Sequence, residues 1–380
     1  MENEVFDIAV LGAGCASFQL LHQMSLQPDW QKKTVALLSD NANLQRSWCF
    51  WSKEVHPLQH LVKKSWSKIN FTGNGFSKTE NIAPYKYHYI PGEDFFNYFK
   101  KIFLPQNKNI IQLTGIVENV SKNKKYFFIE SNHLKFQSEN VFSSLPPLAE
   151  FDKAKIKLKQ HFKGWFIKTE NSAFDDNTMT MMDFSIPQIN DTRFVYILPF
   201  SSREALIEMT VFSPDIYDDV IYENALNVYM TKHFTRVKFT ILNTEKGAIP
   251  MTDALFSRLG TSGEVLIGTA AGMVKATTGY AFKRIGRDCK QLAEDMAHKK
   301  PLRWTATQGR FRFYDRLLLG IIADEPIKGS VIFEALFKKL PMINIFRFLD
   351  EETYLWEELY LFTKLPFAPF LKQVYKQWTH

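Results

Sequence analysis

The sequence predicts an α/β protein in which a domain of parallel strands and helices is interrupted by an antiparallel sheet and followed by a helical C-terminal region. Three observations support this fold class. The chain opens on a strand, a glycine turn and a helix; residues 162–213 form short alternating strands; and a turn of small residues returns near residue 268. The expected boundaries are 1–75, 100–160 and 245–300 for the first domain, 76–99 and 161–244 for the inserted domain, and 301–380 for the helical region.

The composition indicates a globular protein without a disulfide framework. The 380 residues are 45% hydrophobic and include 34 phenylalanines, which is enough for a sizeable core. The three cysteines, Cys15, Cys49 and Cys289, form no CxxC pair. The opening MENEVFD is acidic, unlike a signal peptide, and no run reaches the ~18 apolar residues of a membrane span. These features predict a cytoplasmic protein.

The net charge of +7 favours anionic partners, such as a phosphorylated cofactor or lipid headgroups. The lysines are scattered, and no compact basic run stands out. We therefore expect no nucleic-acid partner. His56 and His60 have i, i+4 spacing, but Pro57 lies between them and no third ligand is evident, so no metal site is expected.

The first thirty residues predict a Rossmann-like dinucleotide site. An apolar strand over 8–11 leads to Gly12 and Gly14, and a helical stretch follows over 16–24. Gly12 permits a tight turn, and Gly14 lets a pyrophosphate approach the positive end of the helix. Ser17 stands where a third glycine is usual. A second apolar run ends at Asp40, whose carboxylate suits a ribose diol, although an ordinary loop aspartate would fit equally well.

A second turn of this kind follows the inserted sheet. Val265 to Gly268 is a short strand, and Thr269 to Val274 is a turn of small residues that suits a neighbouring phosphate. Turns of this type on both sides of an antiparallel insertion are typical of flavoproteins. From about residue 284 the chain is mostly helical.

The strand LIEMTVFS, Leu206 to Ser213, carries a carboxylate in an apolar run. Strand alternation places Glu208 and Thr210 on one face and Ile207 and Met209 on the other. Glu208 either faces water or lies in a site that uses a carboxyl group. Asp183 has the same two alternatives, a strand-end aspartate or a partner carboxylate.

Several segments together resemble the lycopene cyclase family of flavoproteins, over roughly residues 5–320. The matching segments are GAGCAS, RSWCFW (46–51), MMDF (181–184), FVYILPF, LIEMT, KGAIPM, IGTAAGMVKATTGYAF and FYDRLLL (313–319). The departures are Ser17 in place of a frequent glycine and Ala276 where proline is common. The first domain is then an FAD-binding Rossmann-like domain, and the inserted antiparallel sheet is the substrate domain.

The resemblance implies FAD, active in its reduced form, with NAD(P)H as the electron source. The cofactor-binding residues that it implies are Gly12, Gly14, Ser17, Asp40, Arg46, Gly268, Thr269, Ala270, Gly272 and Gly279.

The activity that the resemblance implies is lycopene β-cyclase: the linear ends of lycopene, or of a related acyclic carotene, close into β-ionone rings by proton addition and loss, without net oxidation. Glu208 would be the acid, oriented by Thr210, with Asp183 as its partner, a proton relay or a group that orients the flavin. Candidate substrate-binding residues are Trp48, Phe50, Tyr196 and Tyr280, whose aromatic faces stabilise cations.

A carotene substrate also implies a peripheral position on the inner face of the membrane. The tail Tyr360–Trp378 mixes aromatic residues with lysines, as interfacial segments do, but a packed C-terminal helix would have the same composition. The oligomeric state stays open.

Two alternative functions remain, one an enzyme on the same fold and the other a binding protein without this activity. The first is a flavin-dependent monooxygenase or isoprenoid-chain reductase; Thr269 after Gly268, where monooxygenases usually carry aspartate, disfavours the monooxygenase. The second is a basic lipid- or RNA-binding flavoprotein, supported only by the charge.

Overall fold

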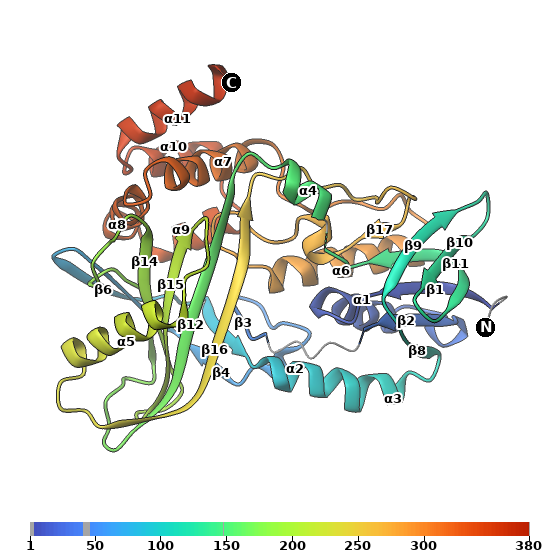
Figure 1. The fold of residues 1–380 in the computed structure, drawn as a ribbon, viewed down its shortest axis with the longest axis horizontal. Coiled ribbons are helices and arrows are strands. Elements are labelled where there is room, and N and C mark those ends of the chain that lie inside the picture. The colour runs from blue at the N-terminus through green and yellow to red at the C-terminus, as the bar shows by residue number, and fades with distance from the viewer. Residues whose placement is uncertain (1–3, 41–45, 147, 380) are drawn as a thin grey trace.

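The computed structural model describes residues 4–40, 46–146 and 148–379, and Figure 1 shows two lobes that meet along long central strands. The right-hand lobe is built on a sheet with the strand order β8-β2-β1-β11-β10-β9, to which β17 adds beside β11. Its strands are β1 (Val5–Leu11), β2 (Val35–Ser39), β8 (Ile110–Thr114), β9 (Val117–Lys122), β10 (Phe127–Ser131), β11 (Lys135–Ser143) and β17 (Val265–Leu266).

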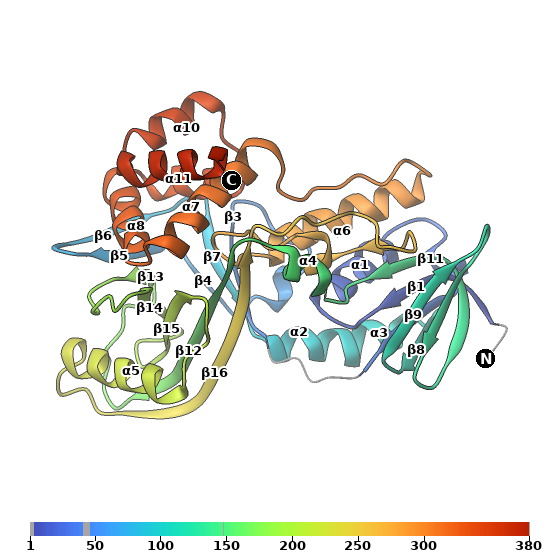
Figure 2. The same ribbon diagram turned by 45° about the horizontal axis from the view of Figure 1, so that its top comes forward.

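The centre of this sheet is parallel, and helices bury it. β1 pairs in parallel with both β2 and β11. Residues 8–11 of β1 and 35–38 of β2 are continuous apolar runs, as expected for strands covered on both faces. Helix α1 (Cys15–Ser25) returns along the sheet and packs beside α6 (Phe282–Ala297). Figure 2 shows this pair of helices above the strands.

An aromatic group fills the space between α1 and a segment from the insertion. α2 (Gly92–Tyr98) continues through η3 (Phe99–Phe103) into α3 (Leu104–Gln106) along the lower side of this lobe. Phe18 of α1 stacks on Phe99 with ring centroids 4.8 Å apart. Short connecting turns complete the lobe: η1 (Trp30–Lys32), η2 (Gln59–Leu61), α4 (Leu148–Lys153) and η4 (Gly268–Ala271).

The second lobe is built on another sheet, with the order β16-β12-β15-β14-β13-β5-β6. Neighbouring strands are antiparallel except β13 and β5, which are parallel. The strands are β5 (Lys68–Gly73), β6 (Phe76–Asn81), β12 (Lys157–Thr169), β13 (Thr178–Asp183), β14 (Thr192–Pro199), β15 (Glu204–Ser213) and β16 (Phe239–Thr252).

The two faces of this second sheet have different neighbours. One face packs on α5 (Asp219–His233), through a cluster that contains Ile207, Met209 and Tyr222. The other face looks toward a three-stranded sheet of β3 (Trp48–Ser52), β7 (Lys86–Ile90) and β4 (Lys64–Trp66) and toward the C-terminal helices.

The helical region covers the upper part of the second lobe (Figures 1 and 2). Phe337 of this region stacks on Phe71 of β5 with centroids 4.4 Å apart, which ties it to the sheet. Its helices are α7 (Gly309–Asp324), α8 (Lys328–Lys339), α9 (Met342–Leu349), α10 (Leu355–Phe362) and α11 (Phe367–Thr379). Among the described residues, no helix is both long and apolar enough to cross a bilayer.

The predicted α/β plan is confirmed, with a parallel-centred sheet, an antiparallel sheet and a helical end. Sheet membership departs from the expected boundaries. β5, expected in the first domain, pairs with β13 of the second sheet. β12 (157–169) and β16 (239–252) extend across the boundaries expected at 160 and 245. Short strands carry no signal for their distant partners, so pairing and not local pattern decides where these segments belong.

Candidate active site

Glu208 lies on the buried face that looks toward the three-stranded sheet. Its neighbours Ile207 and Met209 pack on the α5 side, so alternation turns Glu208 and Thr210 the other way. The Glu208 residue is only 8% exposed. The hydroxyl of Thr210 donates a hydrogen bond to Glu208 Oε1 over 2.9 Å. The carboxyl group is therefore held inside the protein and does not face water.

A second carboxyl group lies beside it. Gly164 of β12 pairs with Glu208 of β15 on one side and with Glu245 of β16 on the other. A Cβ atom on Gly164 would lie 3.1 Å from Glu208 Cβ and 2.7 Å from Leu206 Cδ1. The glycine thus leaves room for the two carboxyl groups, which hydrogen-bond to each other.

Sequence reasoning did not single out Glu245. It opens the segment EKGAIPM, in which Glu245, Gly247 and Ile249 alternate onto one face of β16. That alternation is the one local signal for its orientation. Its meeting with Glu208 depends on the register of β12 between them.

Burial changes the acidity of both groups. Burial raises the pKa of Glu208 well above its usual range, and the charge of Glu245 raises it further. Burial also raises the pKa of Glu245 to about 7. Within the described residues, no lysine or arginine forms an ion pair with either carboxyl group. Both shifts favour the protonated, uncharged form of the carboxyl groups.

Three tyrosines form a hydrogen-bonded group next to this pair. The hydroxyl of Tyr87 lies 2.7 Å from those of both Tyr196 and Tyr280. Tyr196 pairs directly across the strands with Glu208. Cys49 bonds to Tyr196, and burial raises the pKa of its thiol to about 12, so it remains a neutral thiol.

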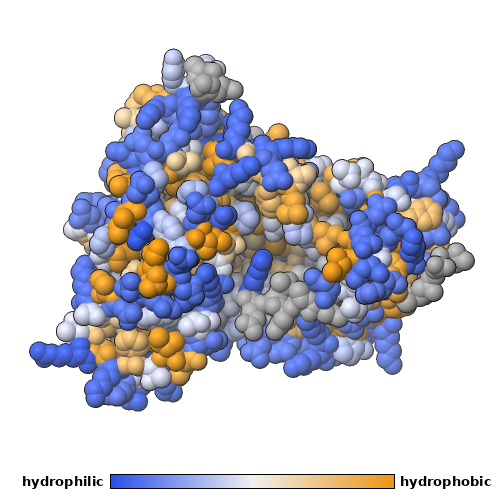
Figure 3. All heavy atoms as spheres, viewed as in Figure 1, coloured by the Kyte–Doolittle hydropathy of each residue, from blue (hydrophilic) through white to orange (hydrophobic). Residues whose placement is uncertain are grey.

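The walls around the carboxyl pair are apolar and aromatic. Phe166 stacks on Phe200, which in turn contacts Tyr89 of β7. Phe166 and Phe200 are half-buried, so part of each ring is left uncovered. The space-filling view shows the surface hollowed between the two lobes, on the face that carries β12 and β16 (Figure 3).

The predicted substrate residues divide into two groups. Tyr196 and Tyr280 belong to the tyrosine group beside Glu208. Trp48 and Phe50 point from the opposite face of β3 into the core of the first lobe, where both rings contact Phe282. The alternate residues of β3, Cys49 and Trp51, face the tyrosines.

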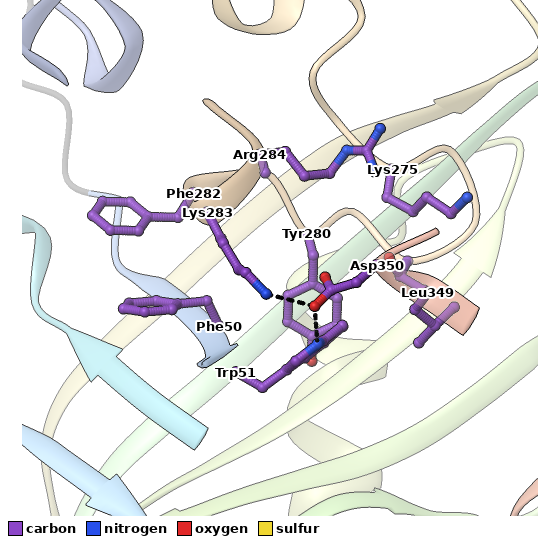
Figure 4. A pocket seen from close by; sticks show the side chains of 11 residues that line it. Phe50, Trp51, Lys275, Tyr280, Phe282, Lys283, Arg284, Leu349 and Asp350 are labelled. Atoms are coloured by element: carbon purple, nitrogen blue, oxygen red, sulfur yellow. Dashed lines mark hydrogen bonds and ion pairs between the residues drawn. The ribbon is translucent and has the colours of Figure 1, made fainter. Parts of the chain in front are cut away.

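A pocket lies on the outer side of Trp51 and Tyr280, as Figure 4 shows. Asp350 accepts hydrogen bonds from Trp51 Nε1 at 3.0 Å and from Lys283 at 2.5 Å. The Trp51 ring meets Tyr280 edge-on, with centroids 4.6 Å apart. The pocket and the carboxyl site thus share Tyr280, whose hydroxyl bonds to Tyr87 on the inner side.

Asp183 lies on the other face of the sheet. One of its oxygens accepts a hydrogen bond from Tyr229 of α5 at 2.6 Å, and the other accepts one from the Ser185 amide at 2.8 Å. These contacts give Asp183 a structural role at the end of β13. The structure does not bring it to Glu208.

The first glycine turn forms an open cradle at the start of α1. Gly12 has a φ of +91°, and a Cβ atom there would lie 2.5 Å from Ser144 Oγ. A Cβ atom on Gly14, which caps α1, would meet no other atom within 4 Å, and no side chain caps the helix. The buried Ser17 hydroxyl donates a hydrogen bond to Ser144 and fits the place of the third glycine. Free backbone amides at a helix start suit a phosphate group.

The late turn lies against this cradle. A Cβ atom on Gly268, whose φ is +63°, would lie 2.6 Å from Ala16 Cβ, so η4 and the first turn of α1 touch. Thr269, half-buried, lines a small pocket with Val274, and Ala270 is buried beneath it. Gly272 has a φ of +72° against Phe256.

The segment that follows leaves two buried polar atoms without partners. Gly279 has a φ of +74°, and a Cβ atom there would lie 2.9 Å from Gln160 Oε1. That oxygen and Thr278 Oγ1 are buried and have no hydrogen-bond partner within the protein. Unpaired buried polar atoms are uncommon, and water or a bound group with hydrogen-bonding atoms would satisfy these two. Together with the cradle at Gly14, these atoms fit FAD laid from α1 to the loop at 273–281.

Asp40 and Arg46 are exposed and flank residues 41–45, which lie outside the described part of the chain. Asp40 directly follows β2, the position expected for a ribose contact. Within the described residues, no cluster of histidine, cysteine and acidic side chains could hold a metal ion.

Comparison with known proteins gives a family and a fold. A family model described as "Lycopene cyclase protein" matches residues 7–374. No curated protein matches the chain.

Similar solved structures include a flavoprotein/dehydrogenase from Cytophaga hutchinsonii, with a TM-score of 0.59 and 13% identity over 91% of this chain and 92% of the other. A geranylgeranyl bacteriochlorophyll reductase-like protein from Thermoplasma acidophilum has a TM-score of 0.56 and 12% identity, over 98% and 96% of the two chains. The p-nitrophenol 4-monooxygenase of Pseudomonas putida has a TM-score of 0.54 and 10% identity, over 93% and 94%. At these identities the likeness shows the fold alone, which is the predicted flavoprotein fold.

Proposed function

This chain belongs to the lycopene cyclase protein family, and from that premise we propose that it is a lycopene β-cyclase. The observation that carries the proposal is the buried carboxyl group of Glu208, which lies beside three tyrosines and forms no ion pair among the described residues. Burial raises its pKa well above the usual range. Cyclisation of a hydrocarbon needs a proton donor in dry surroundings. The residues around Glu208 provide both.

Glu208 would supply the proton. A carboxyl group whose pKa is raised by burial is protonated at neutral pH and can therefore give a proton to a bound substrate. Thr210 holds Glu208 Oε1, which leaves the other oxygen to carry the proton. Proton addition to the terminal double bond gives a carbocation, ring closure moves the charge, and proton loss restores a double bond.

The aromatic groups would stabilise the positive charge. Tyr196 and Tyr280 lie next to Glu208, and Phe166 and Phe200 extend the apolar wall. Aromatic faces attract cations by roughly 0.5–2 kcal/mol each, more strongly where water is absent. The hydroxyl groups of Tyr196 and Tyr280 both hydrogen-bond to Tyr87, which holds the two rings in their orientation.

The cofactor of this proposal is FAD in its reduced form, with NAD(P)H as the electron source. The pyrophosphate would lie at Gly12 and Gly14, and the flavin end would meet the unpaired oxygens of Gln160 and Thr278. When bound, reduced FAD supplies an electron-rich ring system whose oxidation state is unchanged after turnover. The first test is whether denaturing the purified protein releases FAD; a protein that stays colourless after FAD is added would contradict the assignment.

We also propose that the protein docks on a membrane surface. α10 and α11 carry large exposed aromatic residues, among them Trp356 (69% exposed), Tyr375 (73%) and Trp378 (83%). Such residues prefer the interface between lipid and water. Lys372 and Lys376 pair with Glu325 and Asp324, so apolar contact, rather than charge, would drive binding.

The deciding experiment is expression in a bacterial host that accumulates lycopene, followed by pigment chromatography. The proposal predicts β-carotene, with γ-carotene as the one-ring intermediate. Unchanged lycopene in cells that contain folded, flavin-loaded protein would contradict it. Hydroxylated or saturated products would instead support a monooxygenase or a reductase on the same fold.

A further inference from the structure

Glu208 and Glu245 are placed as a pair by the sheet itself. Both are direct register partners of Gly164, one on each neighbouring strand, and adjacent antiparallel strands lie about 4.8 Å apart. Two side chains that flank one glycine meet over it, because no Cβ atom separates them. The carboxyl groups hydrogen-bond to each other, which requires one of them to carry a proton.

The groups that face this pair are neutral. They come from every element packed against it: Cys49 from β3, Tyr87 and Tyr89 from β7, Tyr196 from β14, and Tyr280. The nearby cations Lys163 and Lys246 bind Asp219, on the α5 side of the sheet. In the part of the chain that the structure describes, no lysine or arginine pairs with Glu208 or Glu245, so two full negative charges side by side are strongly disfavoured.

We propose that Glu208 and Glu245 share a single proton and work as one acid–base unit, with Glu245 as the residue that sets the protonation of Glu208. The inference rests on the proposed cyclase activity. Glu245 acts through Glu208 and is a positioning residue.

The reaction balances on this unit. Glu208 gives its proton to the terminal alkene carbon, so a C–H bond forms and a carbocation appears. Glu208, now ionised, lies opposite the positive charge, which favours the cation. The electrons of a second double bond close the ring. A proton leaves the adjacent carbon, its C–H electrons form the new ring double bond, and the pair regains one proton. No electrons are gained or lost overall.

The test is the pH profile of cyclisation by flavin-loaded protein. Glu245→Gln removes the negative charge that helps to keep the proton on Glu208. The alkaline limb of the rate profile should therefore move to lower pH by about one unit, so that the rate at a fixed alkaline pH falls about tenfold. At pH 5.5 the rate should stay within about threefold of wild type, since Glu208 is protonated in both proteins.

Glu204→Gln is the matched control, because Glu204 lies on the same strand, β15, but is exposed and paired with Lys168. Its profile should match that of wild type. A Glu245→Gln profile that coincides with wild type would overturn the inference, and so would an equal loss at every pH. If Glu245→Gln does not fold, Glu245→Asp takes its place, because the shorter side chain moves the charge away from Glu208. It should shift the alkaline limb in the same direction, and an unshifted limb would overturn the inference. Wild-type protein that makes no cyclic carotene contradicts the proposed function instead.

Discussion

Replacing Gly164 with alanine is a sharp test of the carboxyl pair, because it adds one methyl group between two residues that we place in the chemistry. The new Cβ atom would lie 2.7 Å from Leu206 Cδ1, and 3.1 and 3.3 Å from Glu208 Cβ and Cγ. Carbon atoms pack at about 3.5–4.0 Å, so Glu208 must move by about 0.5 Å and Leu206 by about 1 Å. The backbone of Gly164 is extended strand, so alanine adds crowding without a strained dihedral angle.

Two effects should follow. Overpacking of this kind costs about 1–3 kcal/mol of stability. Displacement of the acid by a fraction of an ångström should lower the cyclisation rate by about 10- to 100-fold. Thermal unfolding and carotene formation by flavin-loaded protein measure the two effects separately.

Gly73→Ala is the control. Its Cβ atom would also crowd a neighbour, the ring of Phe76, but Gly73 lies at the end of β5 in the β5–β6 hairpin. The Gly73→Ala protein should lose stability but cyclise at the wild-type rate. A Gly164→Ala protein that binds flavin and cyclises at the wild-type rate would refute the argument that this glycine positions Glu208.

Three further predictions address the cofactor, the pH dependence of folding and the membrane. Gly268→Ala should lose FAD, measured by release on denaturation, because its φ of +63° and the 2.6 Å approach to Ala16 exclude a side chain; retained FAD would contradict the assigned seat. Burial raises the pKa of both carboxyl groups, that of Glu245 to about 7, so between about pH 4.5 and 7 unfolding releases the proton that the pair shares, and the pair's contribution to stability falls as pH rises. The unfolding free energy of wild type minus that of the Glu208→Gln/Glu245→Gln double variant should therefore fall by up to about 1.4 kcal/mol per pH unit in that window, and a flat difference would contradict it. Trp356→Ser with Tyr375→Ser should reduce flotation with liposomes, with or without anionic lipid, and equal recovery of variant and wild type would remove the docking proposal.

The sequence predicted best what is determined locally. The glycine turns at Gly12 and Gly268 are fixed by backbone angles that other residues rarely adopt, and both turns form where expected. The alternation of β15 correctly separated Glu208 and Thr210 from Ile207.

What the sequence could not supply depends on strand register. Glu245 reaches Glu208 only through Gly164 on the strand between them. In the run WCFW every residue suits a buried strand, so alternation cannot tell which pair faces the site; the structure selects Cys49 and Trp51 over Trp48 and Phe50.

Asp183 shows a further limit. The register of β13 shifts between Thr180 and Asp183, on the sides of both β14 and β5. A bulge of this kind changes which face the next side chain takes. Asp183 therefore hydrogen-bonds to Tyr229 on the α5 side, whereas one role that the family resemblance implied for it was that of a partner to Glu208.

The proposed function depends above all on Glu208 being the acid, and the Glu208→Gln protein removes that acid with the least change of shape. Glutamine keeps the outline of the side chain and can still accept the hydrogen bond from Thr210, but it has no carboxylic proton to give. The measurement is the rate of lycopene conversion under reducing conditions by variant protein that retains FAD and a normal unfolding temperature. We predict a loss of about 10²–10⁴-fold. Conversion at the wild-type rate by flavin-loaded Glu208→Gln would show that the proton comes from another group.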